Sequence, residues 1–359
     1  MIGERAGDAA TAFSTDEYDY ALPPDRIAQT PREPRDSSRL LHILPGGGLA
    51  DHTFRDLPGL LREGDLLVAN DTRVRAARLR GRREDGGPAE LLLLERLDRT
   101  RFTALVRPGR RLHGGARVAI GDQLRVTIAG PAAGHPGARV VDLDACGDVE
   151  AAIAAAGEVP LPPYITTPLP DPQRYQTVYA HGDPASAAAP TAGLHFTARV
   201  HAALASRGIG WATLQLDVGL GTFAPITSDD VRSHLMHSEL CTLPPATAAA
   251  IEATRAHGGR VVAVGTTAVR TLESHVDASG NLQPGTVATD LFITPGHRFA
   301  VVDGLLTNFH QPRSSLLVLL AAFTGASRWR HAYGHALVQG YRFLSFGDCM
   351  LCWREEPRG

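Results

Sequence analysis

The spacing of apolar and turn residues changes near Ala151, and this change constrains the fold more than any other feature of the sequence. Between Thr72 and Ala151, short apolar runs such as AELLLLERL and RFTALVRP are separated by glycines and prolines about every 8 to 12 residues. That spacing is typical of a small all-β barrel. Beyond Ala151, segments with a helical pattern alternate with segments that resemble buried strands, which favours an α/β sandwich.

The alternation after Ala151 is regular. TARVHAALASRG predicts a helix that ends at Gly208, and the strand WATLQLDVG follows it. PATAAAIEATRAHGG predicts a second helix, followed by the strand RVVAVG and the helix TTAVRTLESHV. Strand-like and helical pieces also occur in residues 1–71. We therefore expect a three-layer α/β sandwich formed by residues 1–71 and 152–359, with residues 72–151 inserted as a small β-barrel domain.

Composition limits the class of protein. A chain of 359 residues is long for one domain, and 43% hydrophobic with 21% charged residues is an ordinary globular composition. The N-terminus is polar, and the longest apolar run, LLVLLAAF, is too short to span a bilayer. Four cysteines do not make a disulfide framework, and CMLC at Cys349 predicts two buried thiols. We expect a cytoplasmic protein, and a monomer.

All 36 basic side chains are arginine, so neither a Schiff-base lysine nor a phosphate-binding loop lysine is available. The net charge is −2, but Arg73–Arg125 holds 14 Arg against six Asp and Glu, a net +8. On a strand Arg73 and Arg75 would share one face, as would Arg78, Arg80 and Arg82. Such a face is either solvated or binds the phosphates of a nucleic acid, and composition does not decide between the two.

Polar motifs follow several predicted strands. DVGLGTF, GTTAVRTLES and TNFHQPRSS each come directly after a strand, and PTAGLHFT leads into the helix that begins near Thr197. Ligands of open α/β sheets bind at the carboxyl ends of strands, so we expect these motifs to meet in one cleft. The residues expected there are His195, Asp217, Thr267, Arg270, Asn308 and His310.

Other motifs carry less weight. HLMHSE places His234, His237 and Glu239 where they could ligate a metal, but no further His or Cys pattern completes such a site. We therefore favour acid–base or hydrogen-bonding roles and predict no metal. A single His such as His195, between Leu194 and Phe196, is by itself more often a buried core residue.

Together these stretches resemble one family, the S-adenosylmethionine:tRNA ribosyltransferase-isomerases of queuosine synthesis. The resemblance runs nearly end to end. It rests on YDYALPPDRIAQTPREPRDSSRLL, GDLLVANDTRVRAARLRG, RYQTVYA, APTAGLHFT, MHSE, AVGTTAVRTLES, LFITPG, TNFHQPRSSLL and YRFLSFGDCML.

The resemblance implies the reaction. S-adenosylmethionine would be a substrate whose ribosyl part is moved to the aminomethyl group of a 7-deazaguanine base in a tRNA anticodon. The ribose is isomerised to an epoxycyclopentanediol, and adenine and methionine leave. The tRNA would give the arginines Arg73, Arg78, Arg80 and Arg82 a polyanionic partner.

Roles follow from this chemistry as hypotheses. The sulfonium acidifies the ribose C5′ protons, so a base is needed; His195 ranks first, with His237 and His310 as alternatives. Another imidazole or Asp217 would protonate the departing adenine. Arg270, Thr266 and Thr267 suit the methionine carboxylate, and Glu239 or Glu273 suits its ammonium. Phe196, Phe223 or Phe309 would contact the sulfonium. The same motifs make Thr191, Gly193, Gly221, Thr222 and Asn308 further substrate-binding candidates.

The sequence departs from the family pattern at four positions: Asp217, where His is expected; Ala224, for Arg; His297, for an aromatic residue; and Gln311, for Leu. Two alternatives stay open, the first because of these departures and the second because of the arginine face. One is a family member that donates the ribosyl group to a different, small-molecule acceptor. The other is a non-catalytic RNA-binding protein.

Overall fold

In the computed structural model, which describes residues 13–133, 137–219 and 225–354, the chain divides into two units. The sheet unit takes Met1–Thr72, Pro163–Gly182 and Ala189–Gly359, and the barrel unit takes Arg73–Pro162 and Asp183–Ala188. The chain therefore crosses between the units four times, after Thr72, Pro162, Gly182 and Ala188.

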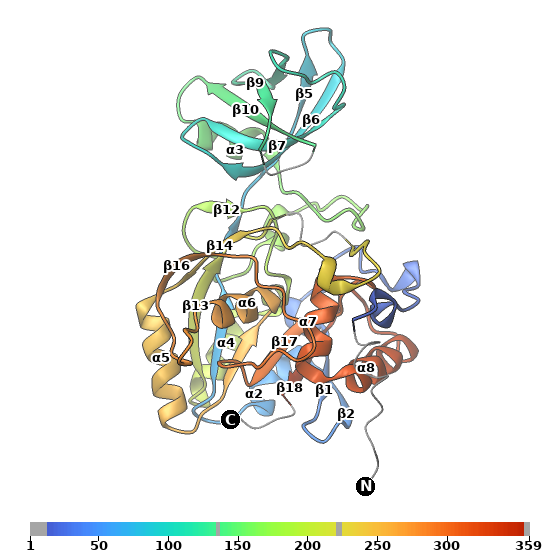
Figure 1. Cartoon of the computed structure of the whole chain (residues 1–359), viewed down its shortest axis with the longest axis vertical. Helices are drawn as coiled ribbons and strands as arrows, with labels where there is room; N and C mark the ends of the chain where they lie inside the picture. The colour runs from blue at the N-terminus through green and yellow to red at the C-terminus, as the bar shows by residue number, and fades with distance from the viewer. Residues whose placement is uncertain (1–12, 134–136, 220–224, 355–359) are drawn as a thin grey trace. The chain divides into compact units, whose positions relative to one another are not determined.

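The described residues of the sheet unit form a nine-stranded mixed sheet (Figure 1). Its strands are, in spatial order, β16 (Gly285–Thr289), β14 (Glu239–Leu243), β13 (Gly210–Leu216), β3 (Leu66–Asn70), β15 (Val261–Val264), β17 (Gly304–Asn308), β18 (Cys349–Trp353), β1 (Arg39–Ile43) and β2 (Leu49–Thr53). The four adjacent strands β13, β3, β15 and β17 run parallel, whereas β18 runs antiparallel to β17 and parallel to β1.

Helices cover both faces of this sheet because its strands are apolar on both sides. Leu66 and Val68 of β3 pack with α5 (Pro245–Ala256), α6 (Thr266–Ser274), α7 (Ser315–Thr324) and α8 (Ala326–Val338). Leu67 and Ala69 pack on the other face with α2 (Leu57–Leu60) and α4 (Ala198–Ser206). Short 3-10 helices among the described residues of the unit are η1 (Thr15–Tyr18), η2 (Pro24–Arg26), η3 (Arg35–Ser37), η4 (Phe54–Asp56), η5 (Pro172–Tyr175), η6 (Thr191–His195) and η8 (Val231–Ser233).

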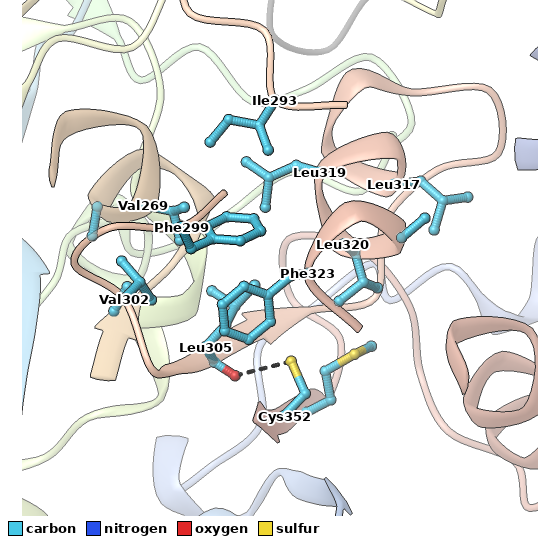
Figure 2. Close-up of a cluster of buried hydrophobic side chains, with 14 of the residues drawn as sticks. Val269, Ile293, Phe299, Val302, Leu305, Leu317, Leu319, Leu320, Phe323 and Cys352 are labelled. Carbon is cyan, nitrogen blue, oxygen red and sulfur yellow. Dashed lines mark hydrogen bonds between the residues drawn. The ribbon is translucent and has the colours of Figure 1, made fainter. Parts of the chain in front are cut away.

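The core on the α6–α7 face is shown in Figure 2, where Val269 of α6, Leu305 of β17 and Phe323 of α7 converge. Cys352 joins this core and its thiol lies 3.4 Å from the Leu305 carbonyl oxygen, whereas Cys349 packs in the core of the opposite face. Both thiols are fully buried and free, as the sequence predicts, and because they face opposite sides of the sheet they do not form a pair.

Among the described residues of the barrel unit, six antiparallel strands form a closed barrel. Their order is β5 (Arg78–Arg83), β6 (Pro88–Arg96), β7 (Arg101–Arg107), β10 (Ala138–Ala145), β9 (Leu124–Pro131) and β8 (Arg117–Ile120), and β8 pairs back to β5. The seventh strand of this sheet, β11 (Gly157–Glu158), lies beside β5, and α3 (Val149–Ala156) packs Val149 and Ile153 into the barrel core. β4 (Arg73–Val74) lies outside the barrel and pairs parallel with β12 (Pro184–Ser186).

The predicted fold class, an α/β sandwich with a small β-barrel, is confirmed. The predicted helices form as α4, α5 and α6, and α7 begins at the predicted N-cap, Ser314, whose hydroxyl accepts the Leu317 N–H. The barrel unit reaches beyond Ala151, because α3 and β11 pack on its strands. None of the described helices is long and apolar enough to cross a membrane.

Candidate active site

The carboxyl ends of β13, β3, β15 and β17 meet at one edge of the sheet because these strands are parallel. Asp217, Asp71, Thr266 and His310 follow the ends of these strands. Ser38 enters the sheet at the same edge, because β1 is parallel to β18 and β18 is antiparallel to β17. Segments far apart in the sequence therefore bring their polar side chains to this edge.

His195 lies at this edge, at the end of η6. Its Nδ1 is 2.7 Å from Ser38 Oγ, its Nε2 is 3.4 Å from Asn308 Nδ2, and its ring stacks on Phe54. The residue is 5% exposed. Burial, and then the positive charges of Arg342 and Arg35, lower the pKa of His195 to about 3. Protonating this imidazole at pH 7 would cost about 5 kcal/mol, so the ring is neutral and acts through hydrogen bonds.

A second buried histidine, His310, lines the same cavity as Asn308, the partner of His195. Asn308 Nδ2 donates to the Leu344 carbonyl oxygen at 3.0 Å, while its Oδ1 is buried and has no hydrogen-bond partner among the residues described. His310 Nε2 is 2.9 Å from Thr307 Oγ1, and burial lowers its pKa to about 3 as well. The edge thus holds two neutral imidazoles and one unsatisfied amide oxygen.

Two small cavities flank Asn308 and His195. The first, of about 40 Å³, is lined by Tyr164, Thr191, Asn308, Phe309, His310, Gln311, Ser314, Leu316, Leu344 and Ser345. The second, of about 20 Å³, is lined by Pro31, Arg32, Arg35, Ser38, Arg174, Leu194, His195, Ser345, Phe346 and Gly347. Ser345 lines both, and its Oγ is 2.7 Å from Tyr164 Oη. Each is far below the 300 Å³ or more of a typical small-molecule site, so a ligand held here would extend beyond it.

The start of α6 faces the same region. Gly265 makes the turn from β15 into α6 with φ of +89°, a conformation that glycine adopts without strain. It lies beside Ala192 of η6. The first N–H groups of a helix attract anions, and the adjacent Thr267 Oγ1 is buried without a partner in the described part of the chain.

Arg270 and Glu239 form a buried ion pair one turn further along α6. Arg270 Nε also donates to the Leu291 carbonyl oxygen at 3.1 Å, and Glu239 Oε1 accepts the Gly219 N–H at 2.8 Å. The two charges predicted to bind a carboxylate and an ammonium therefore bind each other here.

Other predicted residues lie apart from His195. Asp217 Oδ1 accepts the Thr72 hydroxyl at 2.9 Å. Glu273 accepts the backbone N–H groups of residues 300–302. His237 is exposed, two residues before Glu239. These side chains are not gathered with His195 and Asn308.

The two described aromatic candidates are core residues. Phe196 is fully buried and packs edge-on against Phe54 and Trp211, in the core of the α4 face. Phe309 is also fully buried, against Phe343 on the opposite face. The space beside Gly193 is filled by the side chain of Tyr179 and not left for a ligand, because a Cβ at position 193 would lie 2.0 Å from Tyr179 Oη.

Some predicted positions lie outside the described residues, namely Gly221, Thr222, Phe223 and Ala224. Of the other departures from the family pattern, Gln311 lines the first cavity, and His297 Nε2 lies 3.7 Å from Glu273. Within the described ranges, no group of three or more His, Cys, Asp and Glu side chains is arranged to hold a metal ion.

Sequence reasoning assigns no role to several residues at this edge, among them Ser38, Arg35, Tyr164, Arg174, Arg342 and Ser345. Most of them stand inside the motifs named above: Arg35 and Ser38 in PREPRDSSRLL, Arg174 in RYQTVYA and Ser345 in YRFLSFGDCML. The motif was the available signal, but which of its polar residues faces His195 depends on long-range packing.

The arginine face predicted for the barrel forms on β5. Leu79 points into the barrel core, whereas Arg78, Arg80 and Arg82 alternate with it on the outside. Arg80 lies 3.4 Å from Glu90 and 3.5 Å from Glu158, so carboxylates offset part of this charge. Arg73, on β4, is exposed.

Comparison with known proteins gives a consistent result. The family model of queuosine biosynthesis proteins matches residues 15–352. A protein named S-adenosylmethionine:tRNA ribosyltransferase-isomerase from Symbiobacterium thermophilum is 52% identical over 338 residues, which cover 93% of this chain and 98% of that protein. One of the same name from Gloeobacter violaceus is 50% identical over 94% of this chain and 96% of its own. The crystal structure of an S-adenosylmethionine tRNA ribosyltransferase from Thermotoga maritima, 35% identical, covers 94% of this chain and 99% of its own with a TM-score of 0.53.

Proposed function

Because this chain belongs to the family of queuosine biosynthesis proteins, we propose that it is an S-adenosylmethionine-dependent tRNA ribosyltransferase-isomerase. It transfers and isomerises the ribosyl part of S-adenosylmethionine onto the aminomethyl group of 7-aminomethyl-7-deazaguanine in tRNA. Adenine and methionine are the other products. The observation that carries this proposal is the similarity to enzymes of that name over nearly the whole length of both chains. The resemblance predicted from the motifs is thereby confirmed.

Neutral imidazoles suit a reaction that begins beside a fixed positive sulfur. The sulfonium acidifies the ribose C5′ protons, and a neutral imidazole is the form that accepts a proton. A base with a pKa of about 3 is weak, however, so in the ligand-free protein His195 is better suited to orient the substrate than to deprotonate it unaided. Substrate binding that buries an anion nearby would raise this pKa toward the working range.

Asn308 and the start of α6 provide places for the rest of the donor substrate. The unsatisfied Asn308 Oδ1 is an acceptor for a ribose hydroxyl or an amino group. The N–H groups of Thr266 and Thr267, with the Thr267 hydroxyl, suit the methionine carboxylate. Arg270 and Glu239, paired with each other, act as positioning residues that fix α6 against β14.

The second substrate is a polyanion. We propose that Arg73, Arg78, Arg80 and Arg82 contact tRNA phosphates, since a protein with a net charge of −2 needs a local positive surface for this. Action as a monomer, without a metal and in the cytoplasm, stays a prediction.

The test is to incubate the purified protein with S-adenosylmethionine and to measure adenine release by chromatography. Adenine should appear only when tRNA carrying the aminomethyl base is present, with unmodified tRNA as the control. Release that requires a small molecule instead would support the different-acceptor alternative. Binding of tRNA without any adenine release would support the non-catalytic RNA-binding alternative.

A further inference from the structure

The cavity beside His195 is unusually basic. Its lining includes Arg32, Arg35 and Arg174 and contains no carboxylate. A fourth cation, Arg342, is close enough that its charge lowers the pKa of His195. We call this cavity, with the three arginines that line it, the basic hollow.

The guanidinium groups of the basic hollow are held mainly by backbone carbonyls, which orient a charge without cancelling it. Arg35 donates to the carbonyl oxygens of Gln176 at 2.6 Å and Gln173 at 2.8 Å. Arg174 donates to the carbonyl oxygen of Arg32 at 2.6 Å.

The nearby carboxylates described lie outside the lining of the hollow. Glu33, 77% exposed, pairs with Arg174 at 2.8 Å. Asp348 is fully buried and accepts the backbone N–H groups of Arg39 and Arg342. Asp171 acts on Arg35 from a distance.

Arg32 has a different environment from the other two. It is exposed at the mouth of the hollow, and its guanidinium makes no hydrogen bond or ion pair within the described parts of the chain. Burial, and then the charge of Arg174, lower the pKa of Arg35, while Glu33 and Asp171 act in the opposite direction; Arg35 and Arg174 line the same hollow. Such an arrangement is destabilising unless an anion binds among the arginines.

We propose that the basic hollow binds a backbone phosphate of the substrate tRNA and so sets the adjoining nucleotide at His195. This inference rests on the proposed function. Arginine forks match phosphate oxygens in geometry, and the open mouth at Arg32 admits a phosphate that is attached to a chain. The other anion of the reaction, the methionine carboxylate, has a separate set of donors at the start of α6.

Two single variants and their double variant test this. Arg32→Ala removes the exposed cation and Arg174→Ala removes one that contacts the neighbouring loop; the double variant combines them. The matched control is Arg207→Ala, an exposed arginine at the C-terminal end of α4, just before β13 begins at the opposite edge of the sheet. For each variant, KM for tRNA, KM for S-adenosylmethionine and tRNA binding by filter retention at several salt concentrations are measured.

We expect each single variant to raise KM for tRNA by about tenfold, as for the loss of one charge-assisted hydrogen bond. The slope of log K against log salt should become shallower by roughly 0.7 for each phosphate that the variant no longer neutralises. KM for S-adenosylmethionine should stay within twofold of the wild-type value, and Arg207→Ala should change neither constant.

Two results would overturn the inference. A rise in KM for S-adenosylmethionine with unchanged tRNA binding would mean that the hollow holds the methionine carboxylate. Wild-type constants for Arg32→Ala and for the double variant would mean that it binds neither anion. Both results are distinct from failure of the proposed function, which is read from adenine release by the wild-type protein; the filter-binding measurement does not depend on turnover.

Discussion

Replacing His195 with Asn should make the sheet unit less sensitive to acid. The folded-state pKa of about 3 lies below the ordinary value of 6.5, so between these values the unfolded chain binds a proton that the native protein excludes. The contribution of the neutral imidazole to the free energy of unfolding is therefore fully present above pH 6.5 and is lost as the pH falls toward 3. From the two pKa values, the loss due to His195 alone is about 2 kcal/mol at pH 5.

The assay is urea unfolding followed by tryptophan fluorescence at pH 7.5 and pH 5.0. Trp211, Trp329 and Trp353 are the three tryptophans of the chain and all lie in the sheet unit, so the signal reports on that unit. Between the two pH values, His195→Asn should lose about 2 kcal/mol less stability than the wild type. Effects of carboxylates and of His310 are common to both proteins and cancel in the difference.

His331→Asn, at an exposed position of α8, is the control and should follow the wild type. Activity is a second readout. If His195 acts on the reacting ribose as proposed, His195→Asn should lower kcat by about 10²- to 10⁴-fold while tRNA binding is kept. Equal acid sensitivity of wild type and His195→Asn would refute the assignment of a buried, neutral imidazole.

Three further changes test other parts of the structure. Arg270→Met should destabilise the sheet unit by about 3 to 5 kcal/mol because it leaves the Glu239 carboxylate buried without its cation. Adding Glu239→Gln should recover part of that loss in the same fluorescence assay. If the free-energy costs of the two substitutions are strictly additive, the two residues do not act as a pair. Gly193→Ala should displace η6 and lower the rate of adenine release at least tenfold, since its Cβ would lie 2.0 Å from Tyr179 Oη. Adding Tyr179→Phe should restore part of the rate. An unchanged rate in the single variant would show that η6 tolerates the methyl group. The third variant replaces Arg78, Arg80 and Arg82 with Ala. If the barrel face binds tRNA, the slope of log K against log salt should become shallower by roughly 0.7 to 0.9 for each phosphate left without its cation, equally for all tRNA sequences. Unchanged affinity would mean that the arginines form a solvated face.

Local features were predictable from the sequence. The helices α4 to α7 follow from periodic apolar residues, and Ser314 and Gly208 mark their ends through capping chemistry that acts within a few residues. The expectation that polar motifs meet at the carboxyl ends of the parallel strands also holds for three residues, because His195, Asn308 and His310 lie close together.

Long-range pairing was not predictable in the same way. A motif shows that Phe196 and Phe309 follow polar turns, but not that each ring enters a core on a different face. Likewise Arg270 and Glu239 are 31 residues apart and their mutual pairing depends on how α6 crosses β14. The lining of the basic hollow comes from four separate segments of the chain, so no short stretch of sequence contains its pattern.

The place of β18 in the sheet has a consequence for synthesis on the ribosome. β18 lies between β17 and β1, so the β1–β2 hairpin, made first, lacks its inner neighbour until the last strand of the sheet has been translated. At about 5 to 20 residues per second, the roughly 300 residues between the two strands take about 15 to 60 s to make. During that interval the free edge of β1 is open to wrong partners, whereas the six barrel strands, all contained in residues 78–145, can close while the ribosome is still at work. On the ribosome, the barrel strands can therefore complete their pairing before β1 gains its inner neighbour.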